Sequence, residues 1–472
     1  MSRRALILGA GVGSGHNSAA KAIEAELLRS GFDGEVRRVD VLDTTSDVFN
    51  KLYDDAYFAL VAEVPWLVGW GYDRMDAPFK LATATRWWEQ ANTTSMVREI
   101  RDFDPDLVIC THFLPARMVS LMIARGHLSA PLSLVTTDYD FQGMWLTVPV
   151  TQLFVAREET RQYLLTLGLP EDRVTASGIP VRAEFSSPLD AEDVRARYRL
   201  RPDAPVVLIS AGAAGGPRTL QVVRQALAIT EDFQAVVVCG HNAELKKEVD
   251  ALVAGRDNFR VLGFTTEMPQ LMGISSLFVG KPGGLSSSEC MAAGLPMVII
   301  GPIPGQEERN ADYLLEEGAA VRCNYSTTVG YKIATLLADP ARLEAMAASA
   351  RRVGRPDAAA VVAKTSAALA GRSLWISREA QRLIQRISNE GEENSVEPDE
   401  CLRTLVDPQT GESLALVTES ELPTLGASAQ STTMELSRSK LKALRWLPEY
   451  FALATAGMWL LGDAEKMVIG VR

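Results

Sequence analysis

The 472-residue chain has few cysteines and no long apolar segment, and each absence excludes a class of protein. Its five cysteines are scattered without a CxxC pair, so neither a disulfide framework nor a zinc site is indicated. No window approaches about 20 consecutive apolar residues, and no transmembrane helix is expected. The first residues lead into a strand pattern without the apolar region of a signal peptide. These absences predict a protein of the reducing cytoplasm.

An excess of positive charge is absent as well. Lysine and arginine number 48 against 59 aspartates and glutamates, which gives a net charge of −11. Nonspecific binding to nucleic acid depends on a basic surface, so we expect no nucleic-acid partner. A negative total still leaves room for a local basic patch facing a membrane. The hydrophobic content of 47% is typical of a globular protein, and the length predicts about three domains, or two and an extension.

Short apolar runs alternate with helical patterns in two successive series. The expected strands are Ala5–Leu8, Val36–Val41, Leu107–Thr111, Ser133–Thr137 and Leu153–Val155, then Val206–Ser210, Ala235–Cys239, Phe259–Leu262, Leu277–Val279 and Met297–Ile300. This alternation predicts an α/β fold with two parallel sheets, which bind ligands beyond the carboxyl ends of their strands. We place two domains at residues 1–186 and 200–372, a polar linker at 186–204 and an extension at 373–472.

The segment KPGGLSSSECMAAGLPMVIIGPIPGQEERN, residues 281–310, carries the clearest chemical signal. Gly283 and Gly284 let a backbone approach a ligand closely, and Ser286–Ser288 offer hydroxyls that would cap a helix at Glu289–Ala293. A glycine turn that leads into a helix N-terminus is an anion site, because free N–H groups and the helix dipole point at one spot. Glu289 would then accept hydrogen bonds from the hydroxyls of a ribose.

A second polar cluster follows the next expected strand. Gln306, Glu307 and Asn310 have side chains that suit the hydroxyls of a sugar. A phosphate cradle, a ribose carboxylate and sugar-binding residues in this order indicate a nucleotide sugar. The alternative is an ordinary strand–loop–helix crossover with serine capping, which would leave the second cluster without a purpose.

These motifs resemble the donor-binding half of the family 28 glycosyltransferases. The family pattern K-x-G-G/P-x-(S/T)-x-x-E, then G-L-P, then P-G-Q-E-x-x-N is matched from Lys281 to Asn310. The P-G-Q-E form is more similar to the glycerolipid branch, which includes monogalactosyldiacylglycerol synthase and diacylglycerol glucosyltransferases, than to the peptidoglycan branch. The resemblance covers roughly residues 5–370 and implies the GT-B architecture, in which two Rossmann-like domains face a cleft. The first domain would bind the acceptor and the second the donor.

The resemblance extends to the donor side chains. The residues that it assigns to donor binding are Gly212, Gly215, Phe264, Thr265, Lys281, Gly283, Gly284, Ser286, Glu289, Gln306, Glu307 and Asn310. Phe264 and Thr265 match the segment whose backbone contacts uracil in relatives. The glycine loop that holds Gly212 and Gly215 would open the donor domain toward the cleft.

The loop Gly9–His16 allows two interpretations. It nearly matches a dinucleotide fingerprint, with Asp40 where a dehydrogenase would hold the adenosine ribose, but GxGxxG fails in either register. The loop also resembles the glycine–histidine loop of the glycerolipid enzymes. That resemblance implies that Gly13 and Gly15 contact the acceptor and that His16 deprotonates the acceptor hydroxyl. Alternatively, His16 only fills the start of a helix.

Further acceptor-side residues follow from the resemblance. His112 and Asp138 each follow an expected strand, so His112 would contact the acceptor and Asp138 would support His16 or the acceptor. Asp138-Tyr139-Asp140 superficially matches the DxD metal motif of a different fold. We expect no metal, because a helix dipole and loop amides can neutralise the phosphates.

Two aromatic segments lie outside these motifs. Tyr57, Trp66 and Trp70 belong to residues 50–76, which resemble the segment assigned to acceptor and membrane contact; a buried helical pair is the alternative. Residues 438–461 combine basic and aromatic side chains, which predicts contact with an anionic membrane surface. Docking of the same residues onto the protein's own domains would explain that composition equally well.

The sequence and the resemblance together predict an inverting glycosyltransferase. It would move glucose or galactose from a UDP-sugar to diacylglycerol, with no cofactor besides the donor substrate, at the cytoplasmic face of a membrane. The alternatives are transfer to a polyprenyl-linked or other cell-envelope acceptor, and a non-catalytic membrane scaffold with a degenerate donor site.

Overall fold

The computed structural model describes residues 3–371 except 12–14, 45–93, 125, 148, 168, 213–215 and 217. Beyond them it describes only the backbone of five short strands: β13 (Trp375–Ile376), β14 (Leu405–Val406), β15 (Ser413–Leu414), β16 (Trp459–Leu461) and β17 (Val468–Gly470). β14 and β15 pair antiparallel.

The first domain is built on a six-stranded sheet in the order β2-β1-β3-β4-β5-β6. Its strands are β1 (Arg3–Gly9), β2 (Gly34–Asp40), β3 (Leu107–Cys110), β4 (Leu132–Val135), β5 (Gln152–Val155) and β6 (Val174–Ala176). All pairings are parallel. β3 and β4 are buried along their whole length, which explains why their sequences, LVIC and LSLV, are apolar apart from Ser133.

The second domain repeats this plan in the order β12-β11-β10-β7-β8-β9. Its strands are β7 (Val206–Ser210), β8 (Gln234–Val238), β9 (Phe259–Leu262), β10 (Leu277–Gly280), β11 (Met297–Ile300) and β12 (Ala320–Cys323). These strands also pair in parallel. The predicted α/β class with two Rossmann-like sheets is therefore confirmed.

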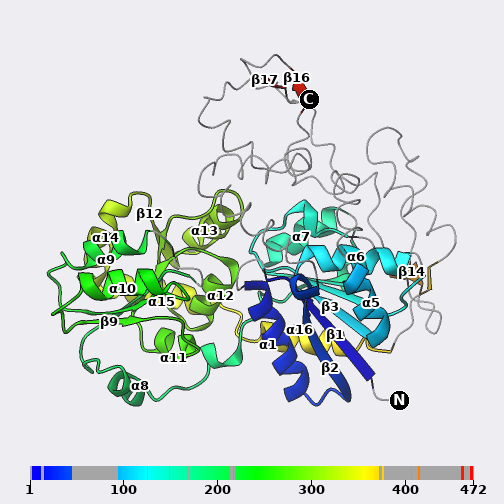
Figure 1. Ribbon diagram of the computed structural model, residues 1–472, viewed down its shortest axis with the longest axis horizontal. Helices are drawn as coiled ribbons and strands as arrows, with labels where there is room; N and C mark the ends of the chain where they lie inside the picture. Colours follow the sequence, from blue (N-terminus) through cyan, green and yellow to red (C-terminus); the bar gives the residue numbers. More distant parts are fainter. Residues whose placement is uncertain are drawn as a thin grey trace.

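Crossover helices cover both sheets (Figure 1). The first domain carries α1 (Gly15–Arg29), α5 (Thr94–Phe103), α6 (Phe113–Ala124) and α7 (Glu158–Thr166). The second carries α9 (Thr219–Ala226), α10 (Ala243–Leu252), α11 (Met268–Gly273), α12 (Gly284–Ala292), α13 (Gln306–Glu316), α14 (Val329–Leu337) and α15 (Pro340–Val353). None of the helices in the described part of the chain has the length and apolar character that a membrane crossing requires.

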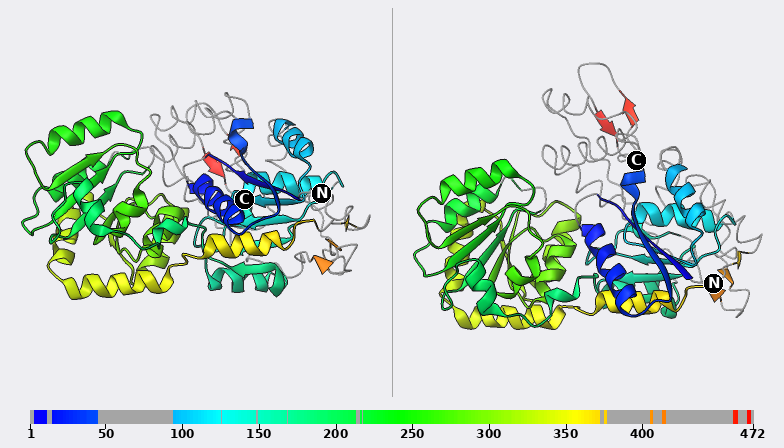
Figure 2. Two further views of the ribbon diagram at one scale, coloured as in Figure 1. Left: turned by 90° about the horizontal axis from the view of Figure 1, so that it is seen from below. Right: turned by 60° about the horizontal axis from the view of Figure 1, so that its bottom comes forward.

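The chain returns to the first domain after α15. Helix α16 (Ala358–Ala367) packs against α1 and the first sheet, and Figure 2 shows α15 and α16 following one another along one side of both domains. The Ser366 hydroxyl donates a hydrogen bond of 2.9 Å to Ser133 in β4. The predicted donor range of residues 200–372 therefore includes a helix that is packed on the first domain.

Three shorter features differ from the expectation. Strands β6 and β12 were not predicted, because each is only three or four residues long and includes polar side chains. The expected linker at 186–204 contains helix α8 (Ala191–Arg197), which packs on α11 through the buried Val194. Its N-terminus is capped by Asp190, whose carboxylate accepts a hydrogen bond of 3.0 Å from the Asp193 N–H. That segment is therefore a packed helix rather than a bare linker.

Candidate active site between the two domains

His16 is the second residue of α1 and stands at the carboxyl ends of β1, β3 and β4. Its Nδ1 lies 3.0 Å from the carbonyl oxygen of Thr111 and 2.9 Å from Oγ1 of Thr137. A carbonyl oxygen can only accept, so Nδ1 carries the proton and Nε2 of the neutral ring keeps its lone pair. None of the hydrogen bonds between described residues uses Nε2. The nitrogen that can act as a base is therefore defined by the fold.

The electrostatic surroundings keep His16 neutral at physiological pH. Burial lowers the pKa of its imidazole below 6.5, against the opposing negative charges of Asp138 and Asp40. The neighbouring His112 is buried, its Nδ1 accepts a hydrogen bond of 3.1 Å from the Leu114 N–H, and burial holds its pKa well below 6.5. Both rings are therefore neutral, and only His16 combines a free ring nitrogen with partial exposure.

Aromatic side chains surround the ring of His16. The His112 ring meets the His16 ring edge-on at 4.5 Å between centroids and stacks on Phe113 at 4.3 Å. Trp145, in the short helix η2 (Gly143–Trp145), lies 6.1 Å from the His16 ring and 6.0 Å from Phe113. Sequence reasoning missed Trp145, because this short turn has no periodic pattern that marks it. The three rings give the base an apolar wall.

The structure removes the basis for a dehydrogenase interpretation of the first loop. Asp40 accepts hydrogen bonds of 3.0 Å from the Gly11 and Leu42 N–H groups and one of 2.5 Å from the Asn17 side chain. A Cβ on Gly11 would lie 2.7 Å from Asp40, so glycine is required for this contact. The carboxylate that would hold a ribose in a dehydrogenase instead braces the loop beside His16.

Asp138 is the predicted catalytic residue that the structure connects most directly to the second domain. It is 4% exposed, and its two carboxylate oxygens accept hydrogen bonds from the side-chain amides of Gln306 and Asn310, the latter at 3.0 Å. Burial raises the pKa of Asp138, while these two amides and the charge of His16 oppose the rise. Two predicted sugar-binding residues therefore contact the predicted partner of the base.

Helix α12 begins earlier than the sequence suggested. Gly283 is its N-cap with no side-chain hydrogen bond, and Gly284 is its first residue. The prediction that Ser286–Ser288 cap a later helix is wrong, because the serines lie inside the helix and Ser288 donates a hydrogen bond to the hydroxyl of Tyr139 at 3.0 Å. No side chain among the described residues hydrogen-bonds to the N–H groups of the first turn, which leaves them for an anion.

Gly284 also lies against the first domain. A Cβ at this position would be 1.8 Å from the carbonyl oxygen of Thr137 and 3.1 Å from a carboxylate oxygen of Asp138. A Cβ on Gly15, at the start of α1, would lie 3.4 Å from Leu285. The N-terminus of α12 and the N-terminus of α1, which holds His16, therefore meet at the domain interface. The predicted base and the predicted anion site lie next to each other there.

Glu289 has the properties of a ligand-binding carboxylate. None of the hydrogen bonds found among the described residues involves its side chain, and burial raises its pKa to about 7 while the charge of Arg182 opposes the rise. A half-buried carboxylate without a donor is costly unless a ligand supplies one. The vicinal hydroxyls of a ribose would be suitable donors.

Basic side chains gather near the phosphate position expected beside α12. Lys281 follows β10 and is exposed, and the charges of Lys281 and Arg218 both oppose the burial that raises the pKa of Glu307. A Cβ on Gly301 would overlap the Arg218 guanidinium. Sequence reasoning missed Arg218, although it lies only two positions after the glycine loop at residues 212–216. Glu307 braces the turn before α13 by accepting a hydrogen bond of 2.7 Å from the Ile303 N–H.

An exposed aromatic pair lies where the uracil base was predicted. Phe264 is 58% exposed and stacks on His241 at 4.1 Å with an interplanar angle of 15°. Oγ1 of Thr265 accepts a hydrogen bond of 3.0 Å from the Glu267 N–H, which fixes the turn after β9. Gly212 adopts φ 76° after β7. All these residues follow strands of the second sheet at the carboxyl edge, where α/β domains bind nucleotides.

Several predicted residues lie outside the described part of the chain. These are Gly13, Gly215, Tyr57, Trp66 and Trp70. Within the described part, no group of three or more His, Cys, Asp and Glu side chains is placed to hold a metal ion. The absence of a metal requirement stays a prediction. In the described part of the chain, a neutral histidine and an open helix N-terminus lie at the domain interface, and the Glu289 carboxylate lies further along the same helix. This arrangement suits transfer from a phosphate-linked donor to a hydroxyl.

Comparison with known families agrees with this geometry. Residues 16–181 match the family profile of monogalactosyldiacylglycerol (MGDG) synthase, and residues 206–362 match that of the glycosyltransferase family 28 C-terminal domain. The chain is 28% identical over 345 residues to the processive diacylglycerol beta-glucosyltransferase of Bacillus licheniformis, covering 72% of this chain and 88% of the relative. The protein of the same name from Bacillus subtilis is 28% identical over 348 residues, covering 73% and 89%.

A solved structure shares the fold. The crystal structure of UDP-GlcNAc 2-epimerase from Neisseria meningitidis bound to UDP-GlcNAc superposes with a TM-score of 0.50 at 14% identity. The match covers 77% of this chain and 99% of that chain. At this identity the likeness concerns the arrangement of the two Rossmann-like domains and not the chemistry.

Proposed function

Because the chain belongs to the glycerolipid branch of the family 28 glycosyltransferases, we propose that it transfers a hexose from a UDP-sugar to diacylglycerol. The product is a membrane glycolipid. The observation that carries the proposal is the position of His16, whose free Nε2 stands beside the interface where the open N-terminus of α12 meets α1.

The second domain binds the donor in this proposal. The free N–H groups of α12 and the basic side chains of Lys281 and Arg218 bind the diphosphate, and the Glu289 carboxylate accepts the ribose hydroxyls. The exposed Phe264 and the turn of Thr265 bind the uracil base. The positive end of the helix stabilises the UDP leaving group as its charge develops, with no cofactor and no metal ion.

The first domain supplies the base and the acceptor site. Nε2 of His16 takes the proton of the acceptor hydroxyl as the oxygen attacks the anomeric carbon opposite the departing UDP. The bond to UDP breaks as the glycosidic bond forms, and one displacement of this kind inverts the configuration. Trp145, Phe113 and His112 form the apolar wall that faces the glycerolipid.

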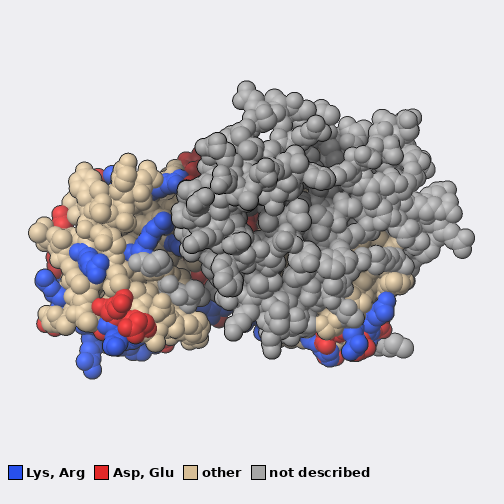
Figure 3. All heavy atoms as spheres, turned by 45° about the horizontal axis from the view of Figure 1, so that its top comes forward, with Lys and Arg blue, Asp and Glu red and all other residues tan. Residues whose placement is uncertain are grey.

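Access to diacylglycerol requires contact with a membrane. On the face drawn in Figure 3, basic and acidic side chains are interspersed over the described surface of the second domain. We therefore assign the contact with an anionic membrane to residues 50–76 and 438–461, whose composition is aromatic and, in the second segment, basic. The protein then works as a peripheral enzyme on the cytoplasmic face.

The test offers each candidate donor and acceptor to the full-length protein. Vesicles containing diacylglycerol or a polyprenyl phosphate are incubated with radiolabelled UDP-glucose or UDP-galactose, and the labelled lipid is identified by mass spectrometry. A hexosyl diacylglycerol from either donor supports the proposal. Label in the polyprenyl lipid alone would favour the cell-envelope alternative, and UDP binding without any labelled lipid would favour a scaffold.

A further inference from the structure

We infer that Asp138-Tyr139-Asp140 is a latch between the two domains, and that Asn310 is its central positioning residue rather than a ligand of the sugar. The inference deepens the proposed function, because the latch holds the carboxylate next to the proposed base. It begins from an arrangement that the sequence does not reveal. Four residues spaced along one face of α13, namely Gln306, Arg309, Asn310 and Tyr313, all contact the first domain.

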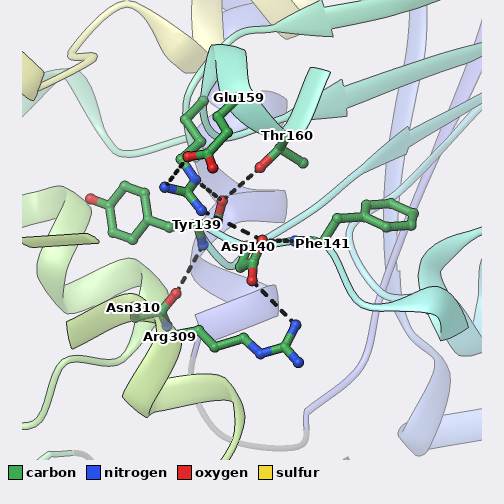
Figure 4. A network of polar contacts seen from close by, with 8 residues as sticks. Tyr139, Asp140, Phe141, Glu159, Thr160, Arg309 and Asn310 are labelled. Carbon is green, nitrogen blue, oxygen red and sulfur yellow. Dashed lines mark hydrogen bonds and ion pairs between the residues drawn. The ribbon is translucent and has the colours of Figure 1, made fainter. Parts of the chain in front are cut away.

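Each residue of the latch binds the second domain. Asp138 accepts from Gln306 and Asn310, and the Tyr139 N–H donates to the Asn310 side-chain oxygen at 2.9 Å. The Tyr139 ring lies 4.6 Å from the Tyr313 ring. Figure 4 shows Asn310 and Arg309 reaching Tyr139 and Asp140, and the ion pair between Arg309 and Asp140 measures 3.2 Å.

The first domain holds the other side of the latch in place. The Tyr139 carbonyl oxygen accepts hydrogen bonds of 3.2 Å from Arg157 and 3.0 Å from the Thr160 hydroxyl (Figure 4). Arg157 also lies 3.5 Å from the Asp140 carboxylate and 5.1 Å from the Tyr313 ring. The segment is thus bound by both domains, and its geometry depends on their closure.

The surroundings of Asn310 suit a residue that positions Asp138 and do not suit a residue that binds a sugar. It is fully buried, and its amide is used at both ends, since Nδ2 donates to Asp138 while Oδ1 accepts from Tyr139. A side chain with no exposed surface, whose amide nitrogen and oxygen both already bind protein groups, is not placed to bind a hydroxyl of a ligand. It can, however, fix the Asp138 carboxylate, whose charge acts on His16 and whose neighbour Thr137 contacts the His16 ring.

The first experiment separates a positioning residue from a sugar ligand. In Asn310→Ala we expect kcat to fall on the order of 100-fold, because Asp138 loses its fixed position, while the Kd for UDP-glucose changes by less than about threefold. A Kd for UDP-glucose that rises in step with the loss of kcat, with the Kd for UDP unchanged, would identify Asn310 as a sugar ligand and overturn the inference. Asp312→Asn, an exposed change on the same helix, is the matched control and should resemble the wild type.

The second experiment swaps the carboxylate of Asp138 and the amide of Asn310 between the two positions. Asn310→Asp places two carboxylates about 3 Å apart, which cannot both stay ionised without repulsion. We expect the peptide containing residues 138–141 to exchange its amide hydrogens faster at pH 8 than in the wild type. The double variant Asp138→Asn/Asn310→Asp can restore all the hydrogen bonds. Its new amide at position 138 would donate to the new carboxylate at position 310 and still accept from Gln306, and that carboxylate would still accept from the Tyr139 N–H. Protection should therefore return, although turnover stays low without the Asp138 carboxylate.

The amide-exchange experiment tests whether the latch exists, and it needs no substrate. Wild-type protection in Asn310→Asp, or a double variant that exchanges as fast as Asn310→Asp, would overturn it. Arg309→Gln removes the ion pair with Asp140 at the edge of the latch and leaves Asn310 in place. It keeps the test decisive if Asn310→Asp does not fold: faster exchange of the peptide containing residues 138–141 supports the latch, and unchanged exchange contradicts it. If the wild-type protein makes no glycolipid, the proposed function is wrong. The amide-exchange data still show whether the latch between the domains exists.

Discussion

The proton on Nδ1 of His16 leaves Nε2 as the nitrogen that can accept a proton from the acceptor. We predict that His16→Ala lowers turnover by roughly 10²–10⁴-fold, the usual contribution of a general base, and leaves the affinity for UDP unchanged. Initial rates of glycolipid formation and calorimetry with UDP measure the two effects. Near wild-type turnover in this variant would remove His16 from the mechanism.

The pKa of His16 fixes the pH dependence of turnover. Burial lowers this pKa below 6.5, so the ring stays neutral and active until the pH falls below that value. The acid limb of kcat, measured at saturating donor, should therefore lie below pH 6.5. The Asp138 charge raises the pKa of His16, so Asp138→Asn should move the limb to still lower pH. A limb centred above pH 7 in the wild type would contradict this assignment.

Glu289 predicts a separate pH effect on donor binding. Its pKa is raised to about 7 by burial, so the carboxylate is mostly protonated at pH 6 and mostly ionised at pH 8. Ribose hydroxyls donate best to the ionised form, and UDP-glucose has no phosphate that titrates in this range. Affinity for UDP-glucose should therefore rise about tenfold from pH 6 to pH 8. In Glu289→Gln, calorimetry should give a weaker and flat profile; a wild-type slope in this variant would show that another group titrates.

At the scale of the element, helix α12 requires glycine at its first residue. A methyl group on Gly284 would overlap the backbone carbonyl of Thr137, and backbone cannot move aside as a flexible side chain can. We predict that Gly284→Ala separates the two domains, raises amide exchange around residues 137–141 and lowers kcat, while the second domain still binds UDP. Unchanged exchange and kcat would show that the domains do not need this close contact.

Helices and strands were predicted correctly where the local sequence pattern alone defines them. Strands β7, β9 and β11 were predicted with their correct bounds, because each is a short run of mostly apolar residues. The start of α12 was predicted too late, since three serines suggested caps while the uncapped glycine turn began the helix. Helix α8 was overlooked because its sequence is mostly charged and only Val194 is buried.

At the scale of the whole molecule, contacts between distant residues could not be predicted. The motifs identified His16, Asp138 and Asn310 one by one, but nothing in the sequence indicates that Asp138 and Asn310, 172 positions apart, share a hydrogen bond. The same holds for α16, which follows the second domain in sequence and packs on the first. The candidate residues could be identified from local patterns, whereas the roles of Gln306 and Asn310 depend on how the domains close.

The role of the C-terminal extension is a further question at this scale. Residues 438–461 lie outside the described residues, apart from the backbone of β16. If they bind an anionic membrane, removal of residues 437–472 leaves a folded protein that no longer sediments with anionic vesicles. If they pack on the two domains, the truncated protein has a lower Tm and any folded fraction still binds vesicles. Thermal melting and vesicle sedimentation of the same preparation distinguish the two.

The central claim concerns the product, and the structure of that product tests it most directly. The lipid formed from diacylglycerol vesicles with UDP-glucose or UDP-galactose is purified, and proton NMR gives the configuration of its anomeric carbon. A single displacement assisted by His16 predicts a β-linked hexosyl diacylglycerol from at least one of the two donors. An α-linked product, or no hexosyl diacylglycerol from either donor, would contradict the account.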